Sequence, residues 1–345
     1  MWSFAYFNKK TKILIMSRDR LGEKPFYYFN KNNNFYFSNS ILSLRKIIGK
    51  NFYFNQKKIN NLLTFPDKTY GLDNETVFNN IYQIPPGTYL KFKIERYSKI
   101  KPISFWKIKI GNKNIQYKKA CYNLKKIIKD TVKKNVRSDV KNSVLVSGGL
   151  DSNTIVSNAN KISKIKGYSL ISTNPKYDER DKIKISEKFN NFKVKYISSN
   201  KKNSLKILEK IIIKSSNILL TPTSLGLALL CENIKKDGRR VLLTGIGGDE
   251  LFCGYYINYL AHINSYNSKS KIFKKKHAFW KQNILKFIRN PNLKNFKDSK
   301  KKNIRDRLHF FTEGNSIPYN YIKKNKKINI KNFSKDMFYN NMLQN

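Results

Sequence analysis

Two glycine-rich segments about a hundred residues apart carry the residues best suited to chemistry. The first, Ser147 to Ser152, reads Ser-Gly-Gly-Leu-Asp-Ser and follows the apolar run 144–146. Glycines let the backbone approach a ligand closely, and N–H groups at the start of a helix attract anions. Asp151 would repel a phosphate unless a cation lay between them, which favours a Mg²⁺ ligand. The segment predicts a nucleotide-phosphate site, and the alternative is a strand-to-helix turn that Asp151 caps.

The second segment follows the apolar run 241–243 and continues through Thr244 and Gly245 to two more glycines and Asp249. Strands that end in such loops can meet at the carboxyl edge of a parallel sheet, where ligands bind. We therefore predict that Asp249 shares one Mg²⁺ with Asp151. The alternative is a structural glycine turn followed by an acidic helix start.

These segments resemble motifs of the asparagine synthetase family. The first resembles the SGGxDS pyrophosphate loop of N-type ATP pyrophosphatases, and the second resembles the family motif GxGGDExFxGY. Residues 17–28 resemble a stretch of the class II glutaminase domain that precedes the synthetase domain, and we interpret Arg18, Asp19 and Arg20 as ion pairs that pin a loop. Matches at 84–89 and 105–106 follow in the family's order.

The resemblance implies ATP-dependent amidation of aspartate, or of a related carboxylate, through an acyl-adenylate, with release of AMP and pyrophosphate. ATP and Mg²⁺ are the implied cofactors, and Asp151 and Asp249 are the implied metal ligands. The implied ATP and pyrophosphate site comprises Val146, Ser147, Gly148, Gly149, Asp151, Ser152, Leu170, Thr244 and Gly245. Ile246 takes a place where some members carry an acidic residue, which leaves the base of the reaction open.

Against the family pattern, we expect this chain to be truncated at both ends. The N-terminal cysteine nucleophile of the glutaminase has no counterpart, so no catalytic residue is predicted and ammonia from glutamine would need another chain. A split-gene partner, a homodimer and an inactive remnant all stay open. A second alternative is an RNA-modifying adenylating enzyme with the same phosphate loop.

The net charge of +48 would suit a nucleic-acid partner. The lysines are spread along the whole chain, however, and they accompany an excess of Asn, Ile, Tyr and Phe, so compositional bias is the favoured explanation. Cys121, Cys231 and Cys253 lie far apart, which predicts reduced, buried thiols and no zinc site. The most apolar stretch, 218–231, is shorter than the ~20 residues of a membrane helix, so we expect a cytoplasmic protein without a membrane partner.

The elements that must position these residues show two different hydrophobic patterns along the chain. Residues 1–110 show short alternating runs and predict a partial antiparallel, β-rich (α+β) domain of glutaminase type, with a hairpin formed by 25–29 and 34–38. Residues 111–345 alternate helical patterns with short apolar runs and predict a doubly wound, parallel-sheet α/β domain that binds ATP. We expect Asp178 and Glu179 to cap the helix that follows them.

Overall fold

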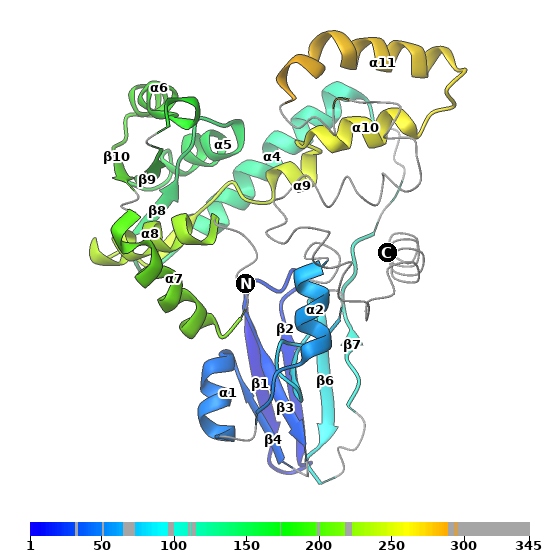
Figure 1. Cartoon of the computed structure of the whole chain (residues 1–345), viewed down its shortest axis with the longest axis vertical. Coiled ribbons are helices and arrows are strands. Elements are labelled where there is room, and N and C mark those ends of the chain that lie inside the picture. Colours follow the sequence, from blue (N-terminus) through cyan, green and yellow to red (C-terminus); the bar gives the residue numbers. More distant parts are fainter. Residues whose placement is uncertain are drawn as a thin grey trace. The chain divides into compact units, whose positions relative to one another are not determined.

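The computed structural model describes residues 1–31, 34–49, 52–64, 73–95, 100–109, 111, 115–172, 174–198, 201–217, 223–288 and 294 (Figure 1). The chain divides into two compact units, one built on Met1–Asn112 with Glu209–Thr221, and one built on Lys113–Leu208 with residues that follow Pro222. None of the described helices combines the length and the apolar character that crossing a bilayer requires.

The N-terminal unit contains two antiparallel sheets, as the alternating runs predict. The four-stranded sheet has the order β1-β2-β6-β7, and its strands are β1 (Ser3–Asn8), β2 (Ile13–Arg18), β6 (Thr88–Lys93) and β7 (Ile103–Ser104). The three-stranded sheet has the order β4-β3-β5, with β3 (Tyr27–Lys31), β4 (Asn34–Ser38) and β5 (Ile81–Gln83). The predicted hairpin is confirmed, because β3 and β4 pair antiparallel.

Layering in this unit follows from the alternation of side chains along a strand. Tyr28 of β3 packs with Met16 of β2 in the core between the sheets. Its neighbour Phe29 points to the opposite face and packs against Leu44 and Leu62. These leucines belong to the helices α1 (Ile41–Ile48) and α2 (Gln56–Thr64), which cover the outer face of the small sheet.

The C-terminal unit is built on a parallel sheet with the order β10-β9-β8-β11. Its strands are β8 (Asn142–Leu145), β9 (Lys166–Ile171), β10 (Val194–Ser198) and β11 (Val241–Leu243). The chain moves outward from β8 to β10 and then returns to place β11 on the other side of β8. The order of strands therefore reverses between β8 and β11.

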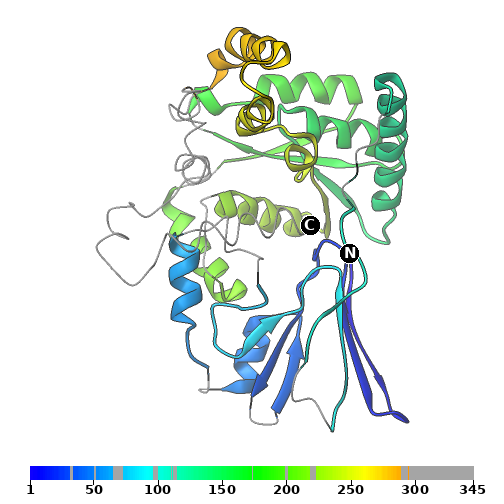
Figure 2. The same ribbon diagram turned by 90° about the vertical axis from the view of Figure 1, so that its right-hand side faces the viewer.

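Helices cover both faces of this sheet, which confirms the doubly wound α/β class (Figure 2). On one face, Val144 packs with side chains of α4 (Tyr117–Val136), α5 (Leu150–Ala159) and α6 (Arg180–Asn190). On the other face, Tyr168 packs with Leu230 and Ile234 of α8 (Thr223–Lys236). Short apolar strands buried on both faces are the pattern expected of a parallel sheet.

The remaining helices follow the same chain order. They are α7 (Lys201–Ser215), the short α9 (Gly248–Phe252), α10 (Tyr256–Asn264) and α11 (Lys271–Asn283), with 3₁₀ turns at Pro175–Tyr177 and Leu285–Phe287. Leu260 of α10 and Trp280 of α11 share a separate buried cluster.

The cysteines correct one prediction. Cys121, Cys231 and Cys253 are free thiols, as predicted, but all three are exposed, not buried. Cys121 lies on α4, whose buried residues, Val132 and Val136, lie in its last turns, and Cys253 ends the short helix α9. An amphipathic helix buries only one face, and the distance between cysteines along the sequence does not show whether a cysteine lies on that face.

Candidate active site

The reversal of strand order between β8 and β11 creates the place where a ligand site is expected. In open α/β sheets, ligands bind beyond the carboxyl ends of the strands at such a switch point. The loop from Val146 to Gly149 leaves β8, and the loop from Thr244 to Gly247 leaves β11. Because β8 and β11 are neighbours in the sheet, both glycine-rich segments start at the same edge.

Asp151 lies directly against the second glycine loop. A Cβ atom added at Gly248 would stand 2.5 Å from both Cγ and Oδ2 of Asp151. A Cβ added at Gly245 would stand 2.8 Å from the backbone nitrogen of Ser152 and 2.9 Å from the Cβ of Asp151. A side chain at Gly245 would meet the backbone of the first loop, and a side chain at Gly248 would displace the Asp151 carboxylate. The glycines of the second loop therefore fix where the Asp151 carboxylate lies.

The first loop is held by its own side chains. The backbone N–H of Ser147 donates to Ser152 Oγ over 3.1 Å, and the N–H of Gly149 donates to Ser147 Oγ over 3.2 Å. The amide of Asn153 donates to the carbonyls of Ser147 and Gly149, at 3.1 and 2.6 Å. Gly149 is the N-cap of α5, so the loop leads straight into the first turn of that helix.

The third N–H group of the loop has a partner from another element. Gly148 N–H donates over 3.0 Å to Oε2 of Glu179, which lies 31 residues further along the chain. Glu179 is the N-cap residue of α6, yet its side chain makes no capping bond to that helix. The cap prediction is wrong for Glu179, because its carboxylate binds the loop that follows β8 instead. Asp178 does accept from the N–H of Arg180 at the helix start.

Asp249 lies next to Gly248 on α9, and its carboxylate packs against the backbone of Gly254. A Cβ at Gly254 would overlap Oδ1 of Asp249, so a larger residue there would displace the Asp249 carboxylate. Glu250 accepts from the Tyr255 hydroxyl over 2.7 Å, and this bond lowers the pKa of the Glu250 carboxyl. Ile246 is exposed and carries no ionisable group.

The other predicted site residues line the same strands. Val146 is buried and donates its N–H to the carbonyl of Tyr168 on β9. Leu170 also lies on β9, where its Cδ2 stands 2.8 Å from the position of a Cβ at Gly226 of α8. Thr244 follows β11 directly. The sheet thus carries Val146, Leu170 and Thr244 on or just beyond three adjacent strands.

The described part of the chain contains no group of three or more His, Cys, Asp or Glu side chains placed to hold a metal ion. A cation held by Asp151 and Asp249 would therefore take its other oxygen ligands from a bound phosphate and from water. Mg²⁺ accepts this arrangement, since it keeps several waters and binds few carboxylates.

Charged residues of the N-terminal motif bind the main chain. The guanidinium of Arg18 donates to the carbonyls of Gly22, Lys24 and Ile84. Asp19 accepts from four backbone N–H groups at 3.0 to 3.3 Å, those of Trp2, Leu21, Glu23 and Lys24. Burial raises the pKa of Asp19, but these four donors outweigh it and leave that pKa below its ordinary value. Side-chain bonds to the backbone thus pin this loop, where ion pairs were predicted.

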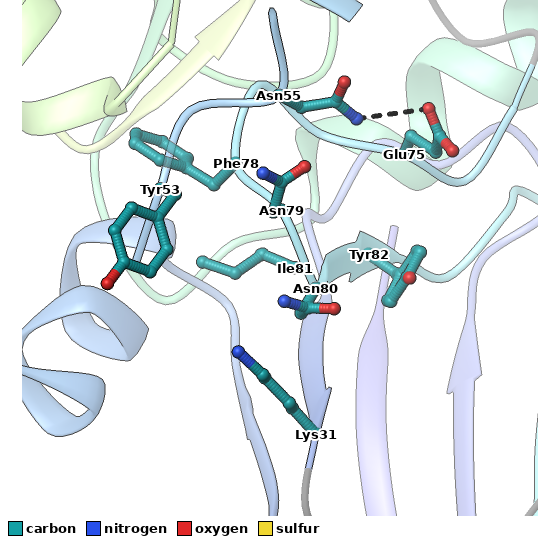
Figure 3. Close-up of a pocket in the computed structure, with 9 residues that line it drawn as sticks. All are labelled: Lys31, Tyr53, Asn55, Glu75, Phe78, Asn79, Asn80, Ile81 and Tyr82. Atoms are coloured by element: carbon teal, nitrogen blue, oxygen red, sulfur yellow. Dashed lines mark hydrogen bonds between the residues drawn. The ribbon is translucent and has the colours of Figure 1, made fainter. Parts of the chain in front are cut away.

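The N-terminal unit also contains a pocket of about 290 Å³. Figure 3 shows three asparagine side chains around it, and the amide of Asn55 donates to Glu75 over 3.2 Å. Asn79 likewise donates to the carbonyl of Phe54, so these two amides brace the surrounding loops. None of the predicted site residues is among those that line the pocket, which are Lys31, Tyr53, Asn55, Glu75, Phe78, Asn79, Asn80, Ile81 and Tyr82.

Comparison with protein families gives two matches. Residues 123–337 match the family model described as asparagine synthase, and residues 1–106 match the model of a glutamine amidotransferase domain. The first match covers more than half of the chain and includes both glycine loops.

Relatives with curated names point the same way. A putative glutamine-hydrolysing asparagine synthetase of Methanocaldococcus jannaschii is 32% identical over 276 residues, which are 77% of this chain and 51% of that protein. Asparagine synthetase 3 of Bacillus subtilis is 25% identical over 77% of this chain and 45% of its own length. An amidase of Penicillium rubens is 22% identical over 74% of this chain and 39% of its own length. The chain thus spans about half the length of these relatives or less.

A solved structure of an ammonia-dependent NAD synthetase from Campylobacter jejuni matches 53% of this chain and 94% of its own, with a TM-score of 0.28 and 15% identity. That similarity is too low to bear on the function of this chain.

Proposed function

Because this chain belongs to the asparagine synthase family, we propose that it activates a carboxylate with ATP and transfers the activated group to ammonia. A carboxylate oxygen attacks the α-phosphorus of ATP, the bond from that phosphorus to the β-phosphate oxygen breaks, and pyrophosphate leaves. Ammonia then attacks the carboxyl carbon of the acyl-adenylate. AMP leaves with the bonding electrons, and the nitrogen loses a proton to give the amide.

The contact of Asp151 with Gly248 carries this proposal. It joins the loop after β8 to the loop after β11 at the point where the strand order reverses. A nucleotide held there would meet backbone N–H groups from a helix start and a carboxylate from the same loop. The first bind phosphate oxygens, and the second binds a cation.

The residues then divide the work by their chemistry. The Gly148 N–H and the hydroxyls of Ser147 and Ser152 bind the pyrophosphate part. Val146, Gly149, Leu170, Thr244 and Gly245 shape the space for the rest of the nucleotide. Asp151 and Asp249 would hold Mg²⁺, which when bound neutralises charge on the departing pyrophosphate.

We assign aspartate as the acceptor, with asparagine as the product, from the relatives named asparagine synthetases. A related carboxylate is the alternative, since relatives named amidases also match. We assign ammonia as the nucleophile that attacks the acyl-adenylate. We place the glutaminase-type domain at residues 1–110 and the ATP-binding domain at 111–345.

The test is exchange of labelled pyrophosphate into ATP by the full chain with MgCl₂, in the presence and absence of aspartate. We expect aspartate-dependent exchange, which Asp151→Asn lowers roughly 100-fold by removing charge needed where pyrophosphate departs. Asp139→Asn, at an exposed position before β8, is the control and should leave the exchange unchanged. If no exchange occurs with aspartate or with any of a panel of related carboxylates, the proposal is contradicted and an inactive chain is favoured.

A further inference from the structure

We propose that Lys182 binds the phosphates of the nucleotide, and that Glu179 occupies the phosphate-binding amide of Gly148 until the nucleotide displaces it. Both residues belong to the start of α6. This inference rests on the proposed function and adds to it two residues of a third segment, separate from both glycine loops.

Glu179 marks the amide that an anion takes. Its Oε2 accepts from Gly148 N–H at 3.0 Å, an ordinary hydrogen-bond distance. Carboxylate and phosphate oxygens are interchangeable acceptors for such an N–H, and both bind it more strongly than a neutral oxygen does. The Glu179 carboxylate therefore lies where the structure can accept a phosphate oxygen.

Gly148 is also the loop amide that is free to exchange its partner. The N–H groups of Ser147 and Gly149 bind hydroxyls of the loop itself, those of Ser152 and Ser147. Asn153 fixes the loop further through two carbonyls. A ligand that took either of these two N–H groups would have to break a hydrogen bond inside the loop. A ligand that takes Gly148 N–H needs only to move an exposed side chain of another helix.

Lys182 lies across the same glycine. Its Cδ and Cβ stand 2.7 and 3.0 Å from the position that a Cβ would have at Gly148, and Glu179 Cβ stands 3.5 Å from it. Residues three apart share one face of a helix, so Lys182 and Glu179 approach the loop together. The aliphatic stem of Lys182 covers the glycine, and its ammonium group is only two bonds beyond the Cδ atom that meets the loop.

The ammonium group of Lys182 is available for a ligand. Within the described residues it forms no ion pair, whereas its neighbours on the helix do: Arg180 pairs with Asp178 at 2.6 Å, and Lys184 approaches Asp181 at 3.9 Å. When a phosphate replaces Glu179 on Gly148 N–H, the amide keeps an anionic partner, so the exchange loses no hydrogen bond. Lys182 then gains the opposite charge that it lacks.

The experiment measures binding of labelled ATP and of pyrophosphate, each with MgCl₂, by equilibrium dialysis with the full chain. Lys182→Met should weaken both roughly 5- to 50-fold, the range of a charge-assisted contact. Lys182→Arg should restore most of the affinity. Lys184→Met, two residues further along the same helix and already paired with Asp181, is the matched control and should stay within twofold of the unchanged chain.

Glu179→Gln tests the displacement. The neutral amide still accepts from Gly148 N–H but competes less well with phosphate, so affinity should rise about threefold or more. Tenfold weaker binding in Glu179→Gln would identify Glu179 as a ligand in its own right and would overturn displacement. Equal affinities of Lys182→Met and Lys184→Met would overturn the role of Lys182 while leaving the proposed function intact. Absence of binding by the unchanged chain would overturn both.

Discussion

Two glycines of the second loop leave room for the Asp151 carboxylate of the first loop. Gly245 and Gly248 leave no room for a Cβ, because the backbone of Ser152 and the carboxylate of Asp151 occupy that space. Neither glycine has a positive φ, so close approach explains them and backbone conformation does not. The absence of a side chain at these two positions lets the two loops approach each other closely.

Gly248→Ala is the sharpest test at the scale of the residue. The new methyl group would stand 2.5 Å from the Asp151 carboxylate and displace it, while the helical backbone of α9 tolerates alanine. We expect pyrophosphate exchange to fall at least about tenfold, since displacement of a group at the reacting centre by about 1 Å costs this much or more. Thermal unfolding should change little.

The control for this variant is Gly111→Ala, because a Cβ at Gly111 meets no atom within 4 Å. Full exchange activity in Gly248→Ala would mean that the position of Asp151 does not matter to the reaction.

At the scale of the element, the parallel sheet is clamped at the edge opposite the glycine loops. Asp237, just after α8, accepts from the ammonium groups of Lys166 and Lys195, each at 2.8 Å, and from the Tyr168 hydroxyl at 2.8 Å. The two lysines belong to β9 and β10, so one carboxylate ties two strands to a helix end. An acidic residue opposes the dipole at a helix C-terminus, and these donors offset that cost.

These contacts make the clamp sensitive to pH. The hydrogen bonds from Lys166, Lys195 and Tyr168, in that order, hold the pKa of Asp237 well below its ordinary value. Its stabilising contribution is therefore complete above the unfolded-state pKa of about 3.9 and is lost as the pH falls through the lower, folded-state pKa. Burial and the bond to Asp237 raise the pKa of the Tyr168 hydroxyl, which stays protonated at neutral pH.

We predict that Asp237→Asn lowers the free energy of unfolding by roughly 1–3 kcal/mol at pH 7, the usual loss when hydrogen bonds to a charged group are removed. The difference from the unchanged chain should shrink as the pH falls below about 4, because Asp237 then binds a proton in the unfolded state but not in the folded state. Urea unfolding followed by circular dichroism at pH 7 and pH 3 measures both values. The control is Asp130→Asn, at an exposed position on α4, which should leave the free energy of unfolding unchanged. An unchanged free energy of unfolding in Asp237→Asn would contradict the prediction.

At the scale of the whole molecule, two units with separate cores share one extreme charge. Tyr28 and Met16 centre one core of the N-terminal unit, and Val144 and Val156 centre a core of the C-terminal unit. The chain carries 70 Lys and Arg residues against 22 Asp and Glu residues, a net charge of +48. A net charge of that size destabilises a compact state through self-repulsion. It also attracts polyanions without sequence preference.

Salt should therefore stabilise the protein. Raising KCl from about 50 to about 500 mM shortens the screening length roughly threefold, so we expect the melting temperature to rise by several degrees. A triple variant of the exposed lysines 274–276 to glutamine on α11 should melt higher at low salt and respond less to KCl. A melting temperature that falls with KCl in both proteins would show that ion pairs outweigh repulsion.

Local sequence patterns alone determined the fold class of both domains and the position of both glycine loops. The alternating runs of the first hundred residues and the buried apolar runs 144–146 and 241–243 gave the two fold classes, because periodicity and turn chemistry act over a few neighbouring positions. The same local signals located both glycine loops, which leave neighbouring strands at one edge of the sheet. The motifs also gave the family before any fold was known.

Tertiary structure alone decided which distant groups meet. The contact of Asp151 with Gly248 needed β11 to pair with β8, and that strand order is set by packing across the sheet. The reach of Glu179 to Gly148 spans 31 residues, and the bond from Tyr168 to Asp237 spans 69. Local spacing predicts a cap for an acidic residue at a helix start. A carboxylate, however, binds whichever donor the fold brings nearest, and here that donor was a loop amide on another element.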